Sequence, residues 1–137
     1  SQAHGLSVVE AGPARCEVAG ILGDLHTNLV VTLGQPPHVR SISRLPQALP
    51  YKFRAVSMVA NRDFTSTFDV EADERAHRDA LTGNVRDALM QLRANTKWVE
   101  LTEDAISWVA PATPSDLKRI PALHSMAKGV ILALGHR

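Results

Sequence analysis

Cysteine is almost missing from this chain. A single cysteine, Cys16, occurs among 137 residues, so an internal disulfide is excluded. The fold must therefore be stabilised by its core, and the composition fits a reducing compartment such as the cytoplasm. Because Cys16 lies in the partly alternating apolar run C-E-V-A-G-I-L, we interpret it as a small buried hydrophobic residue rather than a reactive thiol.

Aromatic residues are also few, at 4% of the chain, so the core must be built from valine, leucine, isoleucine and alanine. Apolar residues make up 45% of the sequence and charged residues 21%, a balance that is typical of folded rather than disordered chains. Domains commonly contain about 100–150 residues. We therefore expect residues 1–137 to form a single domain.

Neither an excess of positive charge nor a long apolar run is present. The formal net charge is +1, and no segment concentrates the cationic residues that binding to a phosphate backbone requires, so nucleic acid is not an expected partner. No run approaches the ~20 apolar residues of a membrane-spanning helix. The chain begins S-Q-A-H-G without methionine, and we interpret it as processed or excised, with room for a membrane tether upstream.

The motifs of common catalytic and metal sites are missing as well. The histidines form no H-x-H or H-E-x-x-H pair and have no paired Cys/His spacing, so no zinc site is predicted. The chain contains no G-x-S-x-G elbow, no G-x-G-x-x-G run and no Walker loop. We predict no cofactor. These absences favour a non-catalytic protein, although catalytic triads assemble in space rather than in sequence.

Short apolar or alternating segments, separated by turn residues, fill the first 72 positions. This pattern is typical of antiparallel hairpins or a meander. The segment V-R-S-I-S-R-L at 39–45 alternates between two faces and is flanked by prolines, so we predict an edge strand that could accept a partner strand. The predicted strands are 6–11, 16–22, 28–33, 39–45, 53–60 and 64–72.

Helical periodicity begins at Asp73, where acidic residues favour a helix N-terminus. The T-G-N triplet at 82–84 interrupts this helix, and a second helix follows that ends near Asn95. The segment K-W-V-E-L-T-E-D-A-I-S-W-V-A at 97–110 then predicts a β-hairpin whose turn lies at 103–104.

The last predicted helix opens with T-P-S-D-L-K-R. Thr113 is its predicted N-cap, Pro114 takes the first helical position, and Asp116 completes a capping box. Pro121 either kinks this helix or marks its true start. The sum is an α+β domain: an antiparallel sheet of about six to eight strands with two or three helices packed on one face, in the order strands, helix, helix, hairpin, helix.

The stretch 63–77, D-F-T-S-T-F-D-V-E-A-D-E-R-A-H, concentrates acidic residues and a histidine. It could be a metal or acid–base site, or the polar side of a strand that leads into a helix. Because a strand alternates its sides, Asp69, Glu71 and Asp73 should share the outer side when the apolar residues between them enter the core. His77, on the helix, should face a separate surface. We therefore interpret the stretch as architecture.

Three polar residues remain as candidate ligand contacts. His124 lies on the otherwise apolar face of the last helix, where a histidine is more often a hydrogen-bonded core residue than a catalyst. Asp24 and His26 lie in G-D-L-H-T-N, which is either a compact polar loop or ordinary hairpin-turn chemistry. If the chain binds a small molecule, we expect His124, Asp24 and His26 to contact it.

One pattern resembles a known kind of domain. D-F-x-x-x-F-D-V-x-A-D, followed by A-L-T-x-x-V-R-x-A-L-x-x-L, then W-V-E-L-T-E-D-A-I-S-W and an amphipathic helix, resembles uncharacterised bacterial soluble domains. Such domains often follow one or two N-terminal transmembrane helices. The match covers about 63–134 of this sequence. The resemblance implies no activity and no catalytic residue, but it implies a tethered module on the cytoplasmic side of a membrane.

The function that these observations favour is a non-catalytic interaction domain. It would bind a protein partner or a second copy of itself, with any membrane anchor outside the residues of this sequence. The alternative is a small-molecule-binding domain or enzyme whose pocket lies between the sheet and the helices.

Overall fold

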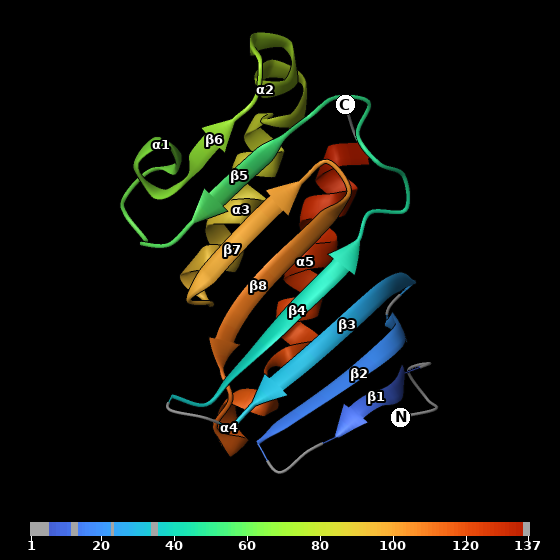
Figure 1. Cartoon of the computed structure of the whole chain (residues 1–137). Helices are drawn as coiled ribbons and strands as arrows, with labels where there is room; N and C mark the ends of the chain where they lie inside the picture. The colour runs from blue at the N-terminus through green and yellow to red at the C-terminus, as the bar shows by residue number, and fades with distance from the viewer. Residues whose placement is uncertain (1–5, 12–13, 23, 34–35, 136–137) are drawn as a thin grey trace.

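The computed structural model describes residues 6–11, 14–22, 24–33 and 36–135 (Figure 1). These residues form one eight-stranded antiparallel sheet and five helices, so the predicted α+β class is confirmed. Two short helices are added to the expected element order. The elements are β1 (Leu6–Ala11), β2 (Arg15–Leu22), β3 (Leu25–Thr32), β4 (His38–Arg44), β5 (Arg54–Ser57), α1 (Phe64–Thr67), β6 (Asp69–Glu71), α2 (Glu74–Ala80), α3 (Gly83–Ala94), β7 (Trp98–Thr102), β8 (Ala105–Pro111), α4 (Pro114–Leu117) and α5 (Ile120–Gly135).

The β7–β8 hairpin lies in the middle of the sheet, whose strand order is β1-β2-β3-β4-β8-β7-β5-β6. Four consecutive strands form a meander, and the hairpin then joins β4 to β5. Because β4 is hydrogen-bonded to β3 on one side and to β8 on the other, the prediction of an edge strand at 39–45 is wrong. The prolines that suggested an edge lie outside β4, where they remove no hydrogen bond from the ladder.

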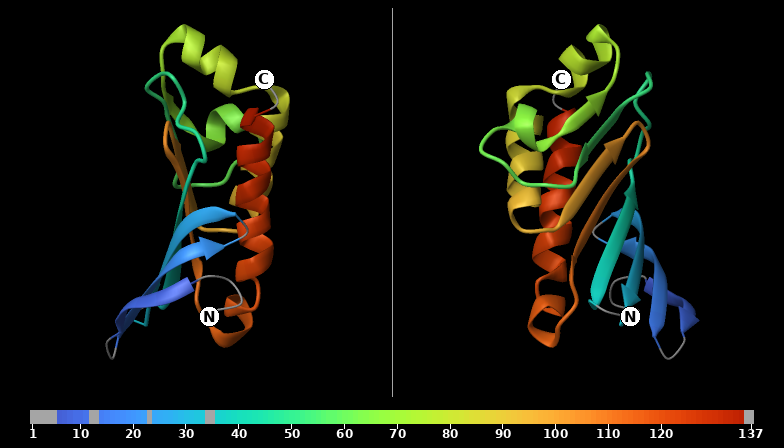
Figure 2. Two further views of the ribbon diagram at one scale, coloured as in Figure 1. Left: turned by 90° about the vertical axis from the view of Figure 1, so that its right-hand side faces the viewer. Right: turned by 60° about the vertical axis from the view of Figure 1, so that its left-hand side comes forward.

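Helices α3 and α5 lie side by side on one face of the sheet, which we call the inner face (Figures 1 and 2). No described helix covers the other, outer face. Cys16, expected in the core, is only partly buried on β2. The buried side chains between the two layers include Val85, Leu89, Leu92, Leu123, Ala127 and Val130 from the helices, and Val39, Val99, Leu101, Ile106 and Trp108 from the sheet.

Side-chain caps fix the starts of α1 and α2. Asp63 and Asp73 each accept a hydrogen bond from the backbone N–H three residues further on, at 2.9 and 2.7 Å. Such a cap typically stabilises a helix by about 1 kcal/mol. The predicted strand at 64–72 is therefore wrong over Phe64–Thr67, which form α1, and only Asp69–Glu71 of that segment pair as a strand.

The predicted last helix is divided into α4 and α5. The capping box at Thr113 forms as predicted, with Pro114 in the first turn of α4. The long helix starts at Ile120, so Pro121 marks its true start, where the missing proline N–H costs no helical hydrogen bond. Leu117, at the end of α4, is exposed. The buried residues of α5 are Leu123, His124, Ala127, Val130 and Leu134.

A buried arginine ties the end of β5 to the end of α3. The Arg93 guanidinium donates from Nε to Ser57 Oγ at 3.1 Å and from Nη2 to the Met58 carbonyl at 3.1 Å. Its Nη1 donates to the Thr96 carbonyl at 2.6 Å. Burial lowers the pKa of Arg93, while its position at the C-terminal end of α3 favours a cation. β5 consequently ends at Ser57, before the end of the predicted strand at 53–60.

Candidate functional site

Two of the three predicted ligand residues meet where the β2–β3 turn rests on α5. His124 Nε2 lies 2.7 Å from the Leu22 carbonyl oxygen. One helical turn later, Lys128 Nζ lies 3.6 Å from Asp24 Oδ2. Asp24 occupies the turn with a φ of 70°, a left-handed conformation that aspartate adopts more readily than most residues. Two polar contacts therefore fix this turn to the helix.

The imidazole of His124 is enclosed, with only 5% of the residue exposed. In the tautomer that carries its proton on Nε2, the ring donates to the Leu22 carbonyl, and Nδ1 is then buried without a hydrogen-bond partner among the described residues. Burial lowers the pKa of His124; the bond to Leu22 opposes this shift, and the charge of Lys128 adds to it. A neutral ring bonded to the backbone is suited to holding the turn.

His26 does not join this contact. Its neighbours Leu25 and Thr27 are buried on the inner face, whereas His26 is exposed. Because alternate residues of a strand point to opposite faces, His26 lies on the outer face, paired across the sheet with Ile21. The side chain of Asp24 is 94% exposed. The three predicted residues therefore form no common pocket.

The acidic stretch 63–77 serves capping and ion pairing. Asp69, Glu71 and Asp73 are all exposed, as predicted. Glu71 lies 3.6 Å from Arg54 in a surface ion pair, and Asp73 caps α2. Within the part of the chain that the structure describes, no group of three or more His, Cys, Asp or Glu side chains could hold a metal ion. The interpretation of this stretch as architecture agrees with these contacts.

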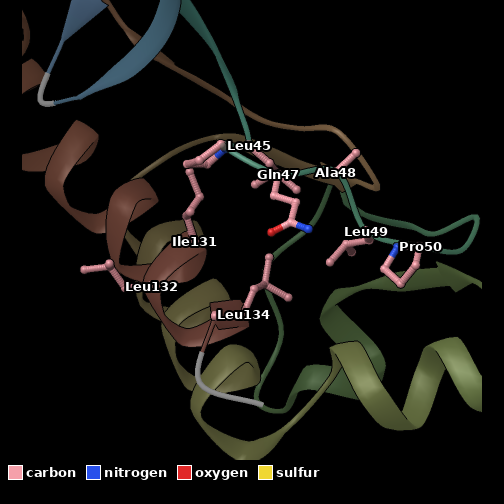
Figure 3. A pocket seen from close by; sticks show the side chains of 10 residues that line it. Leu45, Gln47, Ala48, Leu49, Pro50, Ile131, Leu132 and Leu134 are labelled. Atoms are coloured by element: carbon pink, nitrogen blue, oxygen red, sulfur yellow. The ribbon is translucent and has the colours of Figure 1, made fainter.

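An apolar groove opens between the loop 45–50 and the last turns of α5 (Figure 3). Its volume is about 470 Å³, and its walls include Leu45, Leu49, Ile131 and Leu134. Small-molecule sites commonly enclose roughly 300–1,000 Å³. Gln47 supplies a polar side chain there, and none of the three predicted ligand residues lines the groove.

The outer face presents a row of partly exposed side chains on its central strands. On β4, Arg40, Ile42 and Arg44 point outward because the residues between them are buried on the inner face. Strand register places Val30 of β3 and Val109 of β8 on either side of Arg40. Trp98 of β7 pairs in turn with Val109. We call the following six residues the outer patch: Val30, Arg40, Ile42, Arg44, Trp98 and Val109.

The outer patch carries two arginines, Arg40 and Arg44, that form no ion pair with any described residue. The Arg40 guanidinium carbon lies 5.3 Å from the centre of the Trp98 ring, a cation–π contact. The side chain of Arg44 forms no hydrogen bond or ion pair with any described residue. Three carboxylates near the patch already accept hydrogen bonds: Glu17 from Asn28 at 3.0 Å, Glu100 from Arg54 at 2.7 Å, and Asp104 from Thr102 Oγ1 at 2.9 Å.

Sequence reasoning recognised the alternation in 39–45 but missed the outer patch. The local signal is present, because the alternation in 39–45 puts Arg40, Ile42 and Arg44 on one side of a strand. Their neighbours come from β3, β7 and β8, which no local pattern could bring beside β4. The flanking prolines turned the interpretation towards an edge strand instead.

Comparison with known proteins names no family for this chain. A scan against protein-family models finds no match, and searches of curated proteins and of solved structures find none either. No helix within the described residues is long and apolar enough to cross a membrane. The function must therefore be argued from the outer patch, the groove and the buried contacts themselves.

Proposed function

We propose that the chain is a non-catalytic protein-interaction domain that binds a partner protein, or a second copy of itself, through the outer face of its sheet. The observation that carries this proposal is that described helices cover only one face of the sheet. Helices α3 and α5 pack on the inner face (Figure 2). Ile42, Trp98 and Val109 remain partly exposed on the other face. Aromatic side chains and arginine are enriched in protein interfaces.

The polar groups of the inner side favour binding over catalysis. His124 bonds a backbone carbonyl through Nε2, Asp24 forms an exposed ion pair with Lys128, and His26 lies on the opposite face. A nucleophile and its base must come within about 3 Å of each other or of a shared water. These three side chains do not converge in this way, and they support a structural role.

Site-specific photo-crosslinking tests the proposal. A benzophenone side chain is placed at Asn28, which is exposed on the outer face, or at Gln91, which is exposed on α3. In cells that produce the protein, we expect adducts to a defined protein from position 28 and few from position 91. Sedimentation velocity at concentrations up to about 1 mM separates self-association from binding to another protein. Equal adduct formation at both positions, together with a monomer throughout, would contradict the proposal.

A second candidate function is the binding of an apolar small molecule in the groove beside α5. Its volume of about 470 Å³ and its leucine-rich walls support it. Ala48→Trp should fill the groove, and Ala122→Trp places the same side chain at an exposed position of α5 outside it. We expect the fluorescence of bound anilinonaphthalene sulfonate to be lost in the first variant only. Equal fluorescence in both variants would exclude the groove as the site.

We further propose a cytoplasmic position beside a membrane, held by a segment upstream of residue 1. The support is the resemblance to bacterial domains that follow transmembrane helices. Fractionation of cells that express the full-length protein tests this placement. Recovery in the membrane fraction is expected, and release by a salt wash alone would argue against an inserted anchor.

A further inference from the structure

We propose that the outer patch binds an acidic surface of a different protein, in which apolar side chains are flanked by two carboxylates. The inference rests on the proposed function, and it names the binding surface and the chemistry of the partner. It is carried by the spacing of the two arginines, the apolar side chains around them and the pairing of the nearby carboxylates.

The two arginines define a distance that the partner must match. Arg40 and Arg44 are four residues apart on β4 and point to the same face, so their Cα atoms lie about 13 Å apart. Ile42 lies between them on that face. On a partner helix that rises about 1.5 Å per residue, carboxylates seven or eight residues apart lie on one side, about 11–12 Å apart, and long arginine side chains can span the remaining difference. Each guanidinium can bind a carboxylate through two parallel N–H···O bonds.

The apolar members of the patch supply area and hold one arginine in place. Val30 and Val109 flank Arg40 across the sheet. The Arg40 guanidinium lies over the Trp98 ring at 5.3 Å, so this side chain is already ordered before a partner arrives. Preorganised side chains lose less entropy on binding, and tryptophan and arginine dominate the energetics of many interfaces.

The charged residues of the outer face indicate that the partner surface carries negative charge. Glu17 and Glu100 lie two strands from β4 in the register and already accept hydrogen bonds from Asn28 and Arg54. Asp104 precedes Ala105, the strand partner of Arg44, and it already accepts a hydrogen bond from Thr102 Oγ1 at 2.9 Å. Asp69 on β6 is four strands away from Ile42, about 19 Å at the usual strand spacing. That separation exceeds the screening length of about 8–10 Å in physiological salt. Among the described residues, no carboxylate forms an ion pair with the Arg44 side chain.

The same charges disfavour two other occupants. A symmetric dimer through the patch would bring the arginines of both copies together, because a two-fold interface pairs the same surface with itself. A nucleic acid is disfavoured because two arginines set among apolar side chains provide few phosphate contacts, and the net charge of the chain is only +1. An acidic protein surface satisfies both the charge and the apolar area.

The test uses defined probes and two matched double variants. One probe is a helix-forming peptide with a leucine stripe and glutamates eight residues apart; the others are its lysine counterpart and a single-stranded oligothymidine. Each is titrated into the isotope-labelled protein. We expect the glutamate peptide alone to shift the Trp98 indole signal and the amide signals of β4 and β8. R40E/R44E should weaken its binding at least tenfold, and R40K/R44K should weaken it less, because lysine keeps the charge but not the two parallel N–H···O bonds or the stacking on Trp98.

The control variant R75E/R78E makes the same change in net charge on α2, where both side chains are more than 70% exposed. We expect it to weaken binding less than threefold, and thermal melting confirms that each variant is folded. The inference is overturned if the control variant weakens binding as much as R40E/R44E, or if no peptide binds. It is also overturned if the oligothymidine binds the patch as tightly as the glutamate peptide, or if the protein forms open-ended oligomers through the patch. Adducts from position 28 that persist in R40E/R44E would overturn it and leave the proposed function standing.

Discussion

Replacement of His124 by leucine should make the protein less sensitive to acid. Because burial lowers the pKa of this histidine in the folded chain, the unfolded chain binds its proton first as the pH falls below about 6.5. Folding stability that is present above pH 6.5 is therefore lost below it, by up to about 1.4 kcal/mol per pH unit until the folded ring also protonates. Leucine cannot take up this proton.

At pH 8 the same substitution should change stability little. It removes the hydrogen bond to the Leu22 carbonyl, which lowers the free energy of unfolding by about 0.5–1.5 kcal/mol. The loss is larger if no water molecule replaces the histidine as donor to that carbonyl. The substitution also removes the unpartnered Nδ1, whose burial costs about 1–3 kcal/mol. These two effects oppose each other, so we expect the variant to unfold within about 1 kcal/mol of the parent at this pH.

Urea unfolding at several pH values between about 8 and 5 measures the effect. The groups that face His124, Lys128 on the same helix and Asp24 in the turn, are unchanged in the variant. We expect the parent to lose more stability than His124→Leu across this range, by at most about 2 kcal/mol, whereas His77→Leu, at an exposed position on α2, should follow the parent. Parallel pH profiles for the parent and His124→Leu would refute the reasoning.

Three further substitutions test the packing. Asp73→Ala should lower the free energy of unfolding by about 1 kcal/mol because α2 loses its cap, and Asp69→Ala should change it by less than about 0.5 kcal/mol; urea unfolding compares the two. Arg93→Met should cost about 2 kcal/mol in the same assay because the buried Ser57 hydroxyl and two carbonyls lose their donor, and no loss would contradict this account. Leu89→Ala should cost about 2–5 kcal/mol and lower the melting temperature measured by circular dichroism.

Elements set by neighbouring residues were predictable from the sequence. The capping box at Thr113, the helix start at Asp73 and the hairpin turn at 103–104 each depend on contacts a few residues apart. The alternation of residues 39–44 between two faces of a strand was also predictable, and the burial pattern of β4 follows it. Such features need no knowledge of the rest of the chain.

Elements set by distant residues were not predictable. The contact between His124 and the Leu22 carbonyl joins residues 102 positions apart, and the sequence offers no sign of which turn covers the helix. The strand order that makes β4 central has the same origin. At 64–67 two local signals competed, the apolar alternation and the Asp63 cap, and the cap determined the outcome. The outer patch was not predictable for the same reason, because its residues come from four strands that are neighbours only in the folded sheet.

The insertion of the β7–β8 hairpin into the sheet constrains how the chain is made. As the nascent chain leaves the ribosome, β1 to β4 can pair in order, but β4 has no neighbour on its other side until residues 98–111 emerge. During that interval its free backbone groups can pair with another unfinished chain. A product that stops before residue 98 should therefore aggregate rather than fold as a smaller domain. Once the β7–β8 hairpin is complete, β8 pairs with β4 and closes the edge at which two unfinished chains could associate.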